Sequence, residues 1–250
     1  MKAIDEARRA LPDVPHVAVF DTAFHATIPD EAATYALPKR FREDLGIRRY
    51  GFHGLSVQWS TERVSVPRLV VCHLGGGCSV TAVRDGRSVD TTMGFTPLEG
   101  VPMATRAGSV DPGALLHALH AGVGVDELDH ALEHDSGLVG LGGTDDPREL
   151  EGTLALGVYT YRIATAVGAA AVALDGIDAL VFTAGVGENS APVRAAVCER
   201  LGHLGIELDR GANESLDGEG DIDEPGSVRV LVVHAREDVV VARAVRALLR

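Results

Sequence analysis

The stretch Arg68-Leu-Val-Val-Cys-His73-Leu-Gly75-Gly76-Gly77-Cys-Ser79 is an apolar run that ends in a histidine and breaks into three consecutive glycines. The run predicts a buried strand, and the glycines predict a turn whose backbone N–H groups are not covered by side chains. Such a turn suits an anionic phosphate. A second strand-to-glycine junction follows at Ala179-Leu-Val-Phe-Thr-Ala-Gly185-Val-Gly187-Glu188-Asn189. Two such junctions in one chain raise the question of a nucleotide ligand.

The composition is that of a globular protein, since 250 residues with 46% hydrophobic and 24% charged side chains can bury a sizeable core. No apolar run approaches the about 18 residues of a membrane span, and the first residues contain no apolar signal core. A net charge of −13 disfavours general nucleic-acid binding. The three cysteines contain no Cys-x-x-Cys pair, which favours a reducing compartment. We expect a cytoplasmic protein with no nucleic-acid or membrane partner.

The order of the predicted elements indicates an α/β fold with a mixed sheet flanked by helices and with ligand loops at strand ends. Asp85-Gly86 is a hairpin signal, and Asp111-Pro112 is typical of a helix start. Residues 26–50 predict loop with one short helix, and the acidic, Gly-rich residues 209–227 predict a solvent loop. Strands are expected at 16–20, 68–74, 78–84, 87–90, 179–184 and 228–234, and helices at 3–10, 55–64, 125–134, 146–174, 190–202 and 237–250.

Four side chains are candidates for a chemical role, and from the residues alone each of them could also have an ordinary structural role. Asp21 directly follows a predicted strand, where a carboxylate is either a catalytic or metal-linked acid or part of an Asx turn or cap. Arg106 lies in a Gly/Ala-rich loop, where it either binds oxygens through its fork of donors or pairs with a surface acid. His53 and His73 either face a ligand or pack in the interior.

His130-Ala-Leu-Glu133-His134 matches the inverted zinc-protease pattern His-x-x-Glu-His. Short patterns of this kind arise easily in a chain with ten histidines, and no third ligand stands out downstream. An exposed helix face is the better interpretation of this segment.

Six segments resemble acetate kinases, in the same order and from about residue 15 to the C-terminus. They are Phe20-Asp-Thr-Ala-Phe-His25, Tyr50-Gly-Phe-His53-Gly-Leu-Ser56, His73-Leu-Gly-Gly-Gly-Cys-Ser79, Asp90-Thr-Thr-Met-Gly-Phe-Thr-Pro-Leu-Glu-Gly100, Thr105-Arg-Ala-Gly-Ser-Val-Asp111-Pro and Phe182-Thr-Ala-Gly-Val-Gly-Glu-Asn-Ser190. That family is part of the acetate and sugar kinase/Hsc70/actin superfamily, whose two related domains close around ATP. The resemblance therefore implies an actin-like ATPase (ribonuclease H-like) domain.

The resemblance also implies an activity, namely Mg²⁺-dependent, reversible phosphoryl transfer between ATP and acetate, with propionate as the other substrate to consider. It implies that Asp21, His53 and Arg106 are catalytic and that Glu237 is linked to the metal. Glu237 in a first helical turn is also plain dipole complementarity, and Asp146-Pro-Arg148 is also a capped helix start. The nucleotide-binding residues that the resemblance implies are His73, Gly75, Gly76, Gly77, Asp146, Arg148, Gly185, Gly187 and Asn189.

The chain departs from the family pattern at several positions. Gly76 replaces an asparagine and Val57 a histidine, and the loop around Arg106 has fewer polar residues. The family's first segment, a strand running into Asn-x-Gly-Ser-Ser-Ser-x-Lys, has no counterpart here. We expect residues 1–25 to be the end of a first kinase domain and residues 26–250 to be the C-terminal nucleotide-binding domain.

Two hypotheses therefore follow for the function. The first is a kinase, and the second is a non-enzymatic nucleotide-binding remnant or a partner subunit that needs a separate N-terminal half. Related kinases dimerise through the half present here, so the resemblance also implies that a homodimer is possible.

Overall fold

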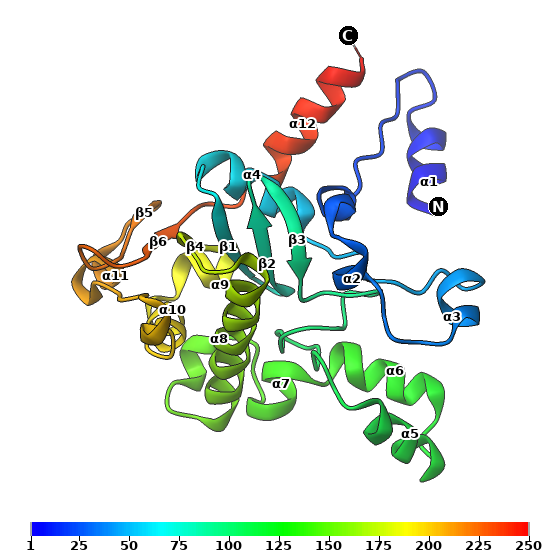
Figure 1. Ribbon diagram of the computed structural model, residues 1–250. Coiled ribbons are helices and arrows are strands. Elements are labelled where there is room, and N and C mark those ends of the chain that lie inside the picture. Colours follow the sequence, from blue (N-terminus) through cyan, green and yellow to red (C-terminus); the bar gives the residue numbers. More distant parts are fainter. Residues whose placement is uncertain (1, 250) are drawn as a thin grey trace.

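The computed structural model describes residues 2–249 and contains a six-stranded mixed sheet with strand order β3-β2-β1-β4-β6-β5 (Figure 1). Strands β1, β4 and β6 are parallel, and β2, β3 and β5 are antiparallel to their neighbours. The glycine turn joins β1 to β2, and Asp85-Gly86 joins β2 to β3, as the sequence predicts. The strands are β1 (Arg68–Leu74), β2 (Cys78–Arg84), β3 (Arg87–Thr91), β4 (Ala179–Thr183), β5 (Gly220–Asp221) and β6 (Arg229–Val232).

Helices cover both faces of this sheet. The long helix α8 (Leu154–Leu174) crosses one face with α10 (Ala191–Cys198) beside it, while α4 (Gly54–Arg63) packs on the other face and α12 (Glu237–Leu248) packs on α4. The remaining helices are α1 (Lys2–Ala10), α2 (Asp30–Ala33), α3 (Lys39–Glu43), α5 (Pro112–His120), α6 (Val125–His134), α7 (Gly137–Gly142), α9 (Ala184–Asn189) and α11 (Arg210–Ser215), with 3₁₀ turns η1 (Ala23–Thr27), η2 (Pro147–Leu150) and η3 (Gly202–Leu204).

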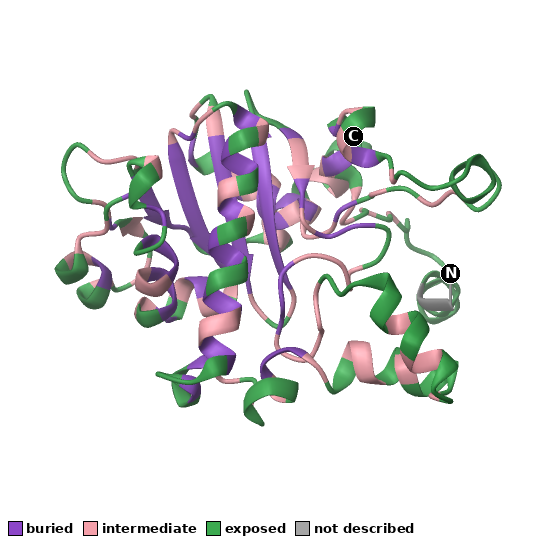
Figure 2. Ribbon diagram, turned by 60° about the horizontal axis from the view of Figure 1, so that its bottom comes forward, coloured by how far each residue is buried: buried purple, intermediate pink, exposed green. Residues whose placement is uncertain are grey.

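Strand β1 is buried on both faces, as Figure 2 shows for the central strands. Cys72 and Leu74 point into the core beneath α8, and Leu69 and Val71 point into the smaller core beneath α4. Because side chains alternate along a strand, His73 comes out on the α4 side. A strand buried on both faces reads as a continuous apolar run, which is why its sequence pattern was clear.

Helix α8 is long and apolar enough to cross a membrane, with a mean hydropathy of 1.2 over an 18-residue window, half of which is buried. It packs along β1, β2 and β3 as the central core helix of this sheet. Its apolar character is therefore explained by packing, and the cytoplasmic location remains a prediction.

The predicted strand at residues 16–20 is wrong. These residues have no regular secondary structure, and exposed and half-buried side chains alternate along them. Phe20 is 64% exposed. An isolated strand is not stable in water, and within residues 2–249 this segment pairs with no other strand.

Other predicted boundaries also needed correction. The helix expected from residue 146 begins only at Leu154, because Gly152 has a positive φ of 73° and Thr153 caps the helix. The helix expected at 190–202 ends at Cys198, and a separate helix, α9, precedes it. Residues 209–227 are not all loop, since they include α11 and β5 and bury Ile222. Helix α7 was not anticipated.

Candidate active site

His53 and His73 stack on one another at the edge of the sheet where β1 ends. Their ring centroids are 3.9 Å apart with 18° between the ring planes. His53 precedes α4 with a left-handed backbone (φ 59°), and its Nδ1 lies 3.0 Å from the Oγ of Ser79. The Nδ1 of His73 lies 2.9 Å from the Oγ of Ser56 on α4. The structure thus brings together two residues that the sequence singled out.

Both imidazoles are neutral at pH 7. Burial lowers the pKa of His53 to about 4; the nearby Asp21 opposes this shift, and the positive charge of Arg106 adds to it. Burial also lowers the pKa of His73 well below its usual value, with a further contribution from His53. Neutral rings can stack closely, and each offers one N–H donor.

The glycine turn leaves open space in front of these rings. A Cβ placed on Gly77 would lie 3.0 Å from the Nε2 of His53 and 3.5 Å from the Nη1 of Arg106. A Cβ on Gly76 would meet nothing within 4 Å. Gly77 therefore borders a space between a histidine and an arginine that a side chain would fill, whereas Gly76 faces outward.

Arg106 is positioned by its backbone rather than by its side chain. Its carbonyl accepts a hydrogen bond from the Met103 N–H (3.0 Å), and the neighbouring Thr105 carbonyl accepts one from Ser136 (2.9 Å). Within residues 2–249 the guanidinium makes a single polar contact, to the Sδ of Met103 at 4.0 Å. The cation is therefore available for an anionic ligand, and the surface ion pair that the sequence left open is not formed.

Asp21 accepts hydrogen bonds from the backbone N–H groups that begin α4, at 2.6 Å from His53 and 3.5 Å from Leu55. Asp21 thus caps a helix whose start lies 32 residues further along the chain, directly beside His53. Among residues 2–249, no hydrogen bond of the local turn or cap that the sequence left open is formed. Burial raises the pKa of Glu237, the first residue of α12, and the negative charge of Asp21 raises it further. The two carboxylates therefore lie close enough to repel one another.

This pair of carboxylates fits a hard divalent cation. Magnesium is commonly held by one or two carboxylates, with waters and phosphate oxygens completing its shell. No group of three or more His, Cys, Asp or Glu side chains that could hold a metal exists in the described part of the chain. Asp21 and Glu237 alone would leave most of the coordination to a nucleotide and water.

The second glycine junction is held in place by Glu188, which the sequence analysis did not single out. Its Oε1 accepts hydrogen bonds from the N–H groups of Ala184 (2.7 Å) and Ala235 (2.9 Å), and its Oε2 lies 2.6 Å from the Nδ1 of His234. Gly185 faces open space, and its carbonyl accepts a hydrogen bond from the Asn189 amide at 2.8 Å. Glu188 thus ties this junction to the segment that leads into Glu237.

A buried arginine completes the support of this junction. The Nη1 of Arg194 donates to the carbonyls of Gly187 (3.0 Å) and Glu188 (2.8 Å), and its Nε donates to Asn213 (2.7 Å). Only 2% of Arg194 is exposed. The sequence offers no local signal for this role, because Arg194 binds Asn213, which lies 19 residues further along the chain.

Asp146 and Arg148 bind each other rather than the residues at the two junctions. The Arg148 guanidinium contacts both carboxylate oxygens of Asp146 at 2.6–3.0 Å, and Asp146 caps the turn η2. The Arg148 side chain is 78% exposed. Among residues 2–249 no hydrogen bond joins this pair to the glycine turns, so the structure realises the capped-turn alternative.

His130 and His134 lie on α6 as exposed side chains with ring centroids 5.0 Å apart. Their nearest carboxylates are Asp135 and Glu133, at 3.6 and 3.8 Å. This is the exposed helix face expected from the sequence.

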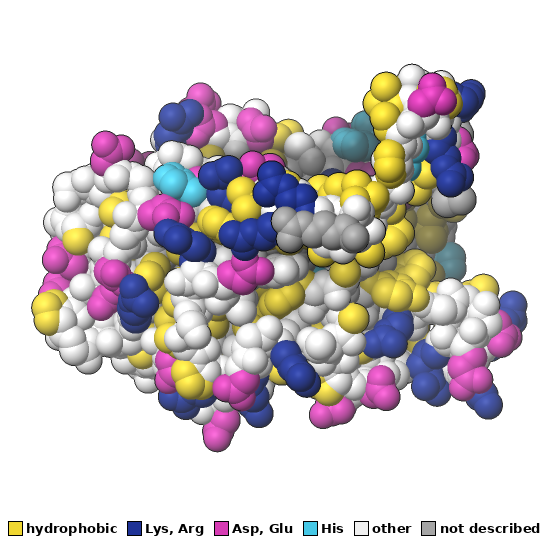
Figure 3. Space-filling model, turned by 90° about the horizontal axis from the view of Figure 1, so that it is seen from above, with side chains coloured by type: hydrophobic (Ala, Val, Ile, Leu, Met, Phe, Trp, Pro, Cys, Tyr) yellow, Lys and Arg dark blue, Asp and Glu magenta, His cyan; other side chains and the backbone are white. Residues whose placement is uncertain are grey.

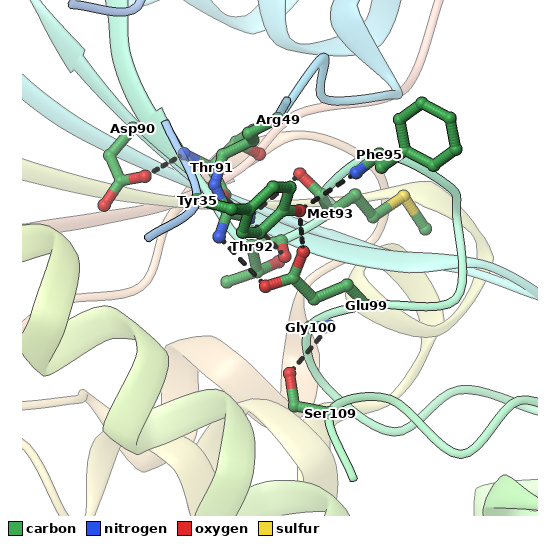
Figure 4. A network of polar contacts seen from close by, with 10 residues as sticks. All are labelled: Tyr35, Arg49, Asp90, Thr91, Thr92, Met93, Phe95, Glu99, Gly100 and Ser109. Atoms are coloured by element: carbon green, nitrogen blue, oxygen red, sulfur yellow. Dashed lines mark hydrogen bonds and ion pairs between the residues drawn. The ribbon is translucent and has the colours of Figure 1, made fainter. Parts of the chain in front are cut away.

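A polar network behind the site links two segments far apart in the sequence (Figure 4). Arg49 donates to the carbonyls of Thr91, Thr92 and Met93 at 2.8–3.1 Å and to Glu99 at 3.0 Å. The Tyr35 hydroxyl also donates to Glu99. A cavity of about 430 Å³ lies beside this network, between β2, β3 and α8. The network holds the segment before His53 against the loop that leads to Arg106, and sequence reasoning missed it.

The sheet, its helices and the glycine turns define an actin-like ATPase domain, as the sequence resemblance predicted. The chain superposes on acetate kinase from Porphyromonas gingivalis with a TM-score of 0.92 at 37% identity, covering 100% of this chain and 68% of that one. A propionate kinase from Francisella tularensis gives a TM-score of 0.91 at 36% identity, with 97% and 67% coverage.

Residues 1–243 match the Acetokinase family, and the chain belongs to this family. It is 51% identical to the acetate kinase of Gloeobacter violaceus, covering 95% of this chain and 64% of that protein. It is 46% identical to the acetate kinase of Nostoc punctiforme, covering 97% of this chain and 65% of the relative. The chain thus spans just under two thirds of the length of these relatives.

Proposed function

We propose that this chain forms the nucleotide-binding side of a kinase that transfers a phosphoryl group reversibly between ATP and acetate. Propionate is the alternative acceptor, because one similar structure is that of a propionate kinase. The observation that supports this proposal most is the space bordered by His53, Arg106 and Gly77. It combines a cation, a neutral N–H donor and an uncovered backbone, which is what a transferring phosphoryl group requires.

Arg106 and His53 would stabilise the negative charge that spreads over the phosphoryl oxygens. Arg106 offers a planar fork of donors, and no carboxylate among residues 2–249 is paired with it. His53 is neutral and adds a directed hydrogen bond without adding charge. Asp21 would fix the position of His53 through its 2.6 Å bond to the backbone N–H and would act near the metal.

Asp21 and Glu237 would hold Mg²⁺, which neutralises phosphate charge when bound. The elevated pKa of Glu237 beside Asp21 supports this assignment, since a divalent cation would relieve the repulsion between the two carboxylates.

The nucleotide would lie along the two glycine junctions. His73, Gly75 and Gly77 would contact its phosphates, and Gly76 would contact them through its backbone alone, because a Cβ at this position would meet only open space. Gly185, Gly187 and Asn189 would lie toward the adenosine. Asp146 and Arg148 are proposed for the adenine and ribose end, where the exposed Arg148 could contact the ligand without leaving Asp146.

We assign residues 1–25 to the end of a first domain and residues 26–250 to the nucleotide-binding domain. Exposed apolar side chains support this boundary: Leu11, Val14 and Phe20 on the N-terminal segment and Leu248 and Leu249 at the end of α12. Figure 3 shows hydrophobic side chains gathered on the face of the molecule on which α12 ends. An N-terminal half, in the same polypeptide or in another, would cover them. A homodimer through the half described here is a further proposal.

The same exposed face supports the second candidate, a nucleotide-binding partner subunit without activity of its own. Acetyl phosphate formation from MgATP and acetate distinguishes the two. We would measure it with the chain alone and with an added fragment equivalent to the N-terminal third of the Gloeobacter violaceus relative. Activity that requires the fragment and is lost in Arg106→Ala supports a kinase whose active site is formed by residues of both halves. No acetyl phosphate under either condition contradicts the kinase proposal.

A further inference from the structure

Two buried serines contact the stacked histidines in the same way. Ser56 and Ser79 are both 0% exposed, and the Oγ of each lies 2.9–3.0 Å from the Nδ1 of His73 and His53, respectively. Ser56 comes from α4 and Ser79 from β2, so two separate elements repeat one arrangement. We propose that Ser56 and Ser79 are positioning residues that hold His73 and His53 as Nε2–H tautomers, with both N–H groups directed at the ligand of the glycine turn.

The direction of each hydrogen bond follows from the burial of the serines. A serine hydroxyl carries one hydrogen, and a buried hydroxyl hydrogen without an acceptor is costly. Within residues 2–249, neither Ser56 Oγ nor Ser79 Oγ has a hydrogen-bond partner other than the histidine. Donation to Nδ1 is the arrangement that gives each of these two hydroxyl hydrogens an acceptor among residues 2–249, so we infer that the serine is the donor. Since Nδ1 is then the acceptor of a neutral ring, the ring hydrogen is on Nε2.

Both Nε2 atoms face the glycine turn. A Cβ on Gly77 would lie 3.0 Å from the Nε2 of His53, and a Cβ on Gly75 would lie 3.8 Å from the Nε2 of His73. In the described part of the chain neither Nε2 has a hydrogen-bond partner. Two parallel donors therefore point into the space that the glycines leave open.

An Nδ1 that accepts a hydrogen bond carries no hydrogen of its own, so this geometry makes both rings neutral. Two imidazolium rings stacked at 3.9 Å would repel one another strongly. At the glycine turn, Arg106 therefore supplies the positive charge, and the two neutral histidines supply directed hydrogen-bond donors. Only the identity of the ligand, a phosphoryl group, rests on the proposed function.

The tautomers can be read directly from long-range ¹H–¹⁵N spectra of the full chain labelled with ¹⁵N-histidine, at pH 7. We expect both rings to show a protonated Nε2 and a bare Nδ1. Ser79→Ala should convert His53 to a mixture of tautomers, and Ser56→Ala should do the same for His73. Ser79→Thr keeps the hydroxyl and should retain the Nε2–H form of His53.

Ser60→Ala is the matched control, because Ser60 lies on α4, is also 0% exposed, and has a hydroxyl with no hydrogen-bond partner among residues 2–249. It should leave both tautomers unchanged. A protonated Nδ1 on either ring of the unmodified chain overturns the proposal, and this result needs no variant to fold. The proposal is also overturned if neither Ser56→Ala nor Ser79→Ala changes the tautomer of the histidine that the serine contacts.

The ligand-facing part has a separate readout. Binding of MgADP should shift both Nε2 resonances. If MgADP binds and neither resonance shifts, the claim that the two Nε2–H groups face the ligand is overturned. Absence of nucleotide binding with the expected tautomers would instead contradict the proposed function and leave the role of the serines standing.

Discussion

The Asp21 carboxylate accepts a 2.6 Å hydrogen bond from the backbone N–H of His53, the residue that turns the chain into α4 with a left-handed backbone. This bond fixes the backbone of His53, the residue whose ring stacks on that of His73. The same carboxylate raises the pKa of Glu237 on the last helix. Asp21 therefore connects the proposed phosphoryl-binding side of the site to the proposed metal-binding side.

In the chain assayed with the added N-terminal fragment, Arg106→Ala should lower acetyl phosphate formation by about 10²–10³-fold. The substitution removes a preorganised cation from the place where negative charge develops on the phosphoryl group. The urea midpoint should not change, since the guanidinium makes one weak contact, to Met103. Arg106→Lys keeps the charge but loses the planar fork, and should give an intermediate rate. An unchanged rate in Arg106→Ala would remove Arg106 from the mechanism.

Glu237→Gln should weaken the Mg²⁺ dependence of ADP binding, measured by calorimetry across a magnesium titration. One of the two carboxylates offered to the cation is then neutral. Asp238→Asn is the control, because Asp238 is the next residue and is paired with Arg236 at 2.9 Å. Equal effects of the two substitutions would argue against a metal at Glu237.

Stability should fall in mildly acidic solution because of His53. Its pKa is about 4 in the folded chain, below the usual 6.5, so the unfolded chain binds more protons between these values. Stability should therefore be lost as the pH falls from about 6.5 toward 4, by on the order of 2 kcal/mol from this group.

His53→Asn suits the left-handed backbone and removes this titration. Urea unfolding at pH 7 and pH 4.5 should show a smaller loss in this variant than in the parent chain. Identical losses in the two proteins would show that His53 is not buried in its neutral form.

Tyr35→Phe should destabilise the chain by about 1–2 kcal/mol, because it removes a partly buried hydrogen bond to Glu99. Lys39→Ala, nearby, removes only an exposed ion pair with Glu43 and should stay within about 0.5 kcal/mol of the parent. Urea unfolding at pH 7 measures both. A Tyr35→Phe variant as stable as Lys39→Ala would contradict the linking role of the network.

The sequence predicted the central part of the fold because it is encoded locally. Strand β1 is a continuous apolar run, the β2–β3 hairpin has Asp85-Gly86, and α5 begins with Asp111-Pro112. The segment at 16–20 has the same local character, but among residues 2–249 no strand pairs with it, and pairing is not a local property. The break before Leu154 depends on the positive φ of Gly152. In the sequence this glycine is followed by a long run of helix-forming residues, so the break could not be recognised.

The fold brings together His53, His73, Arg106 and the glycine turn, all of which the sequence singled out, and their binding roles stay predictions. Its supporting residues could not be predicted, because their partners lie far away in the sequence. Glu188 meets Ala235, and Arg49 meets Glu99, through contacts that only the folded chain creates. Asp146 and Arg148 were placed by resemblance alone, and the structure pairs them with each other.

The most direct test compares two adjacent glycines for binding of MgADP by calorimetry. Gly77→Ala places a methyl group 3.0 Å from the Nε2 of His53 and 3.5 Å from Arg106, in the space proposed for a phosphate. Gly76→Ala places one where nothing lies within 4 Å. We expect Gly76→Ala to bind nucleotide like the parent and Gly77→Ala to lose at least about tenfold in affinity, or about 1.4 kcal/mol. Equal affinities in all three proteins would contradict the claim that this turn holds the nucleotide phosphates.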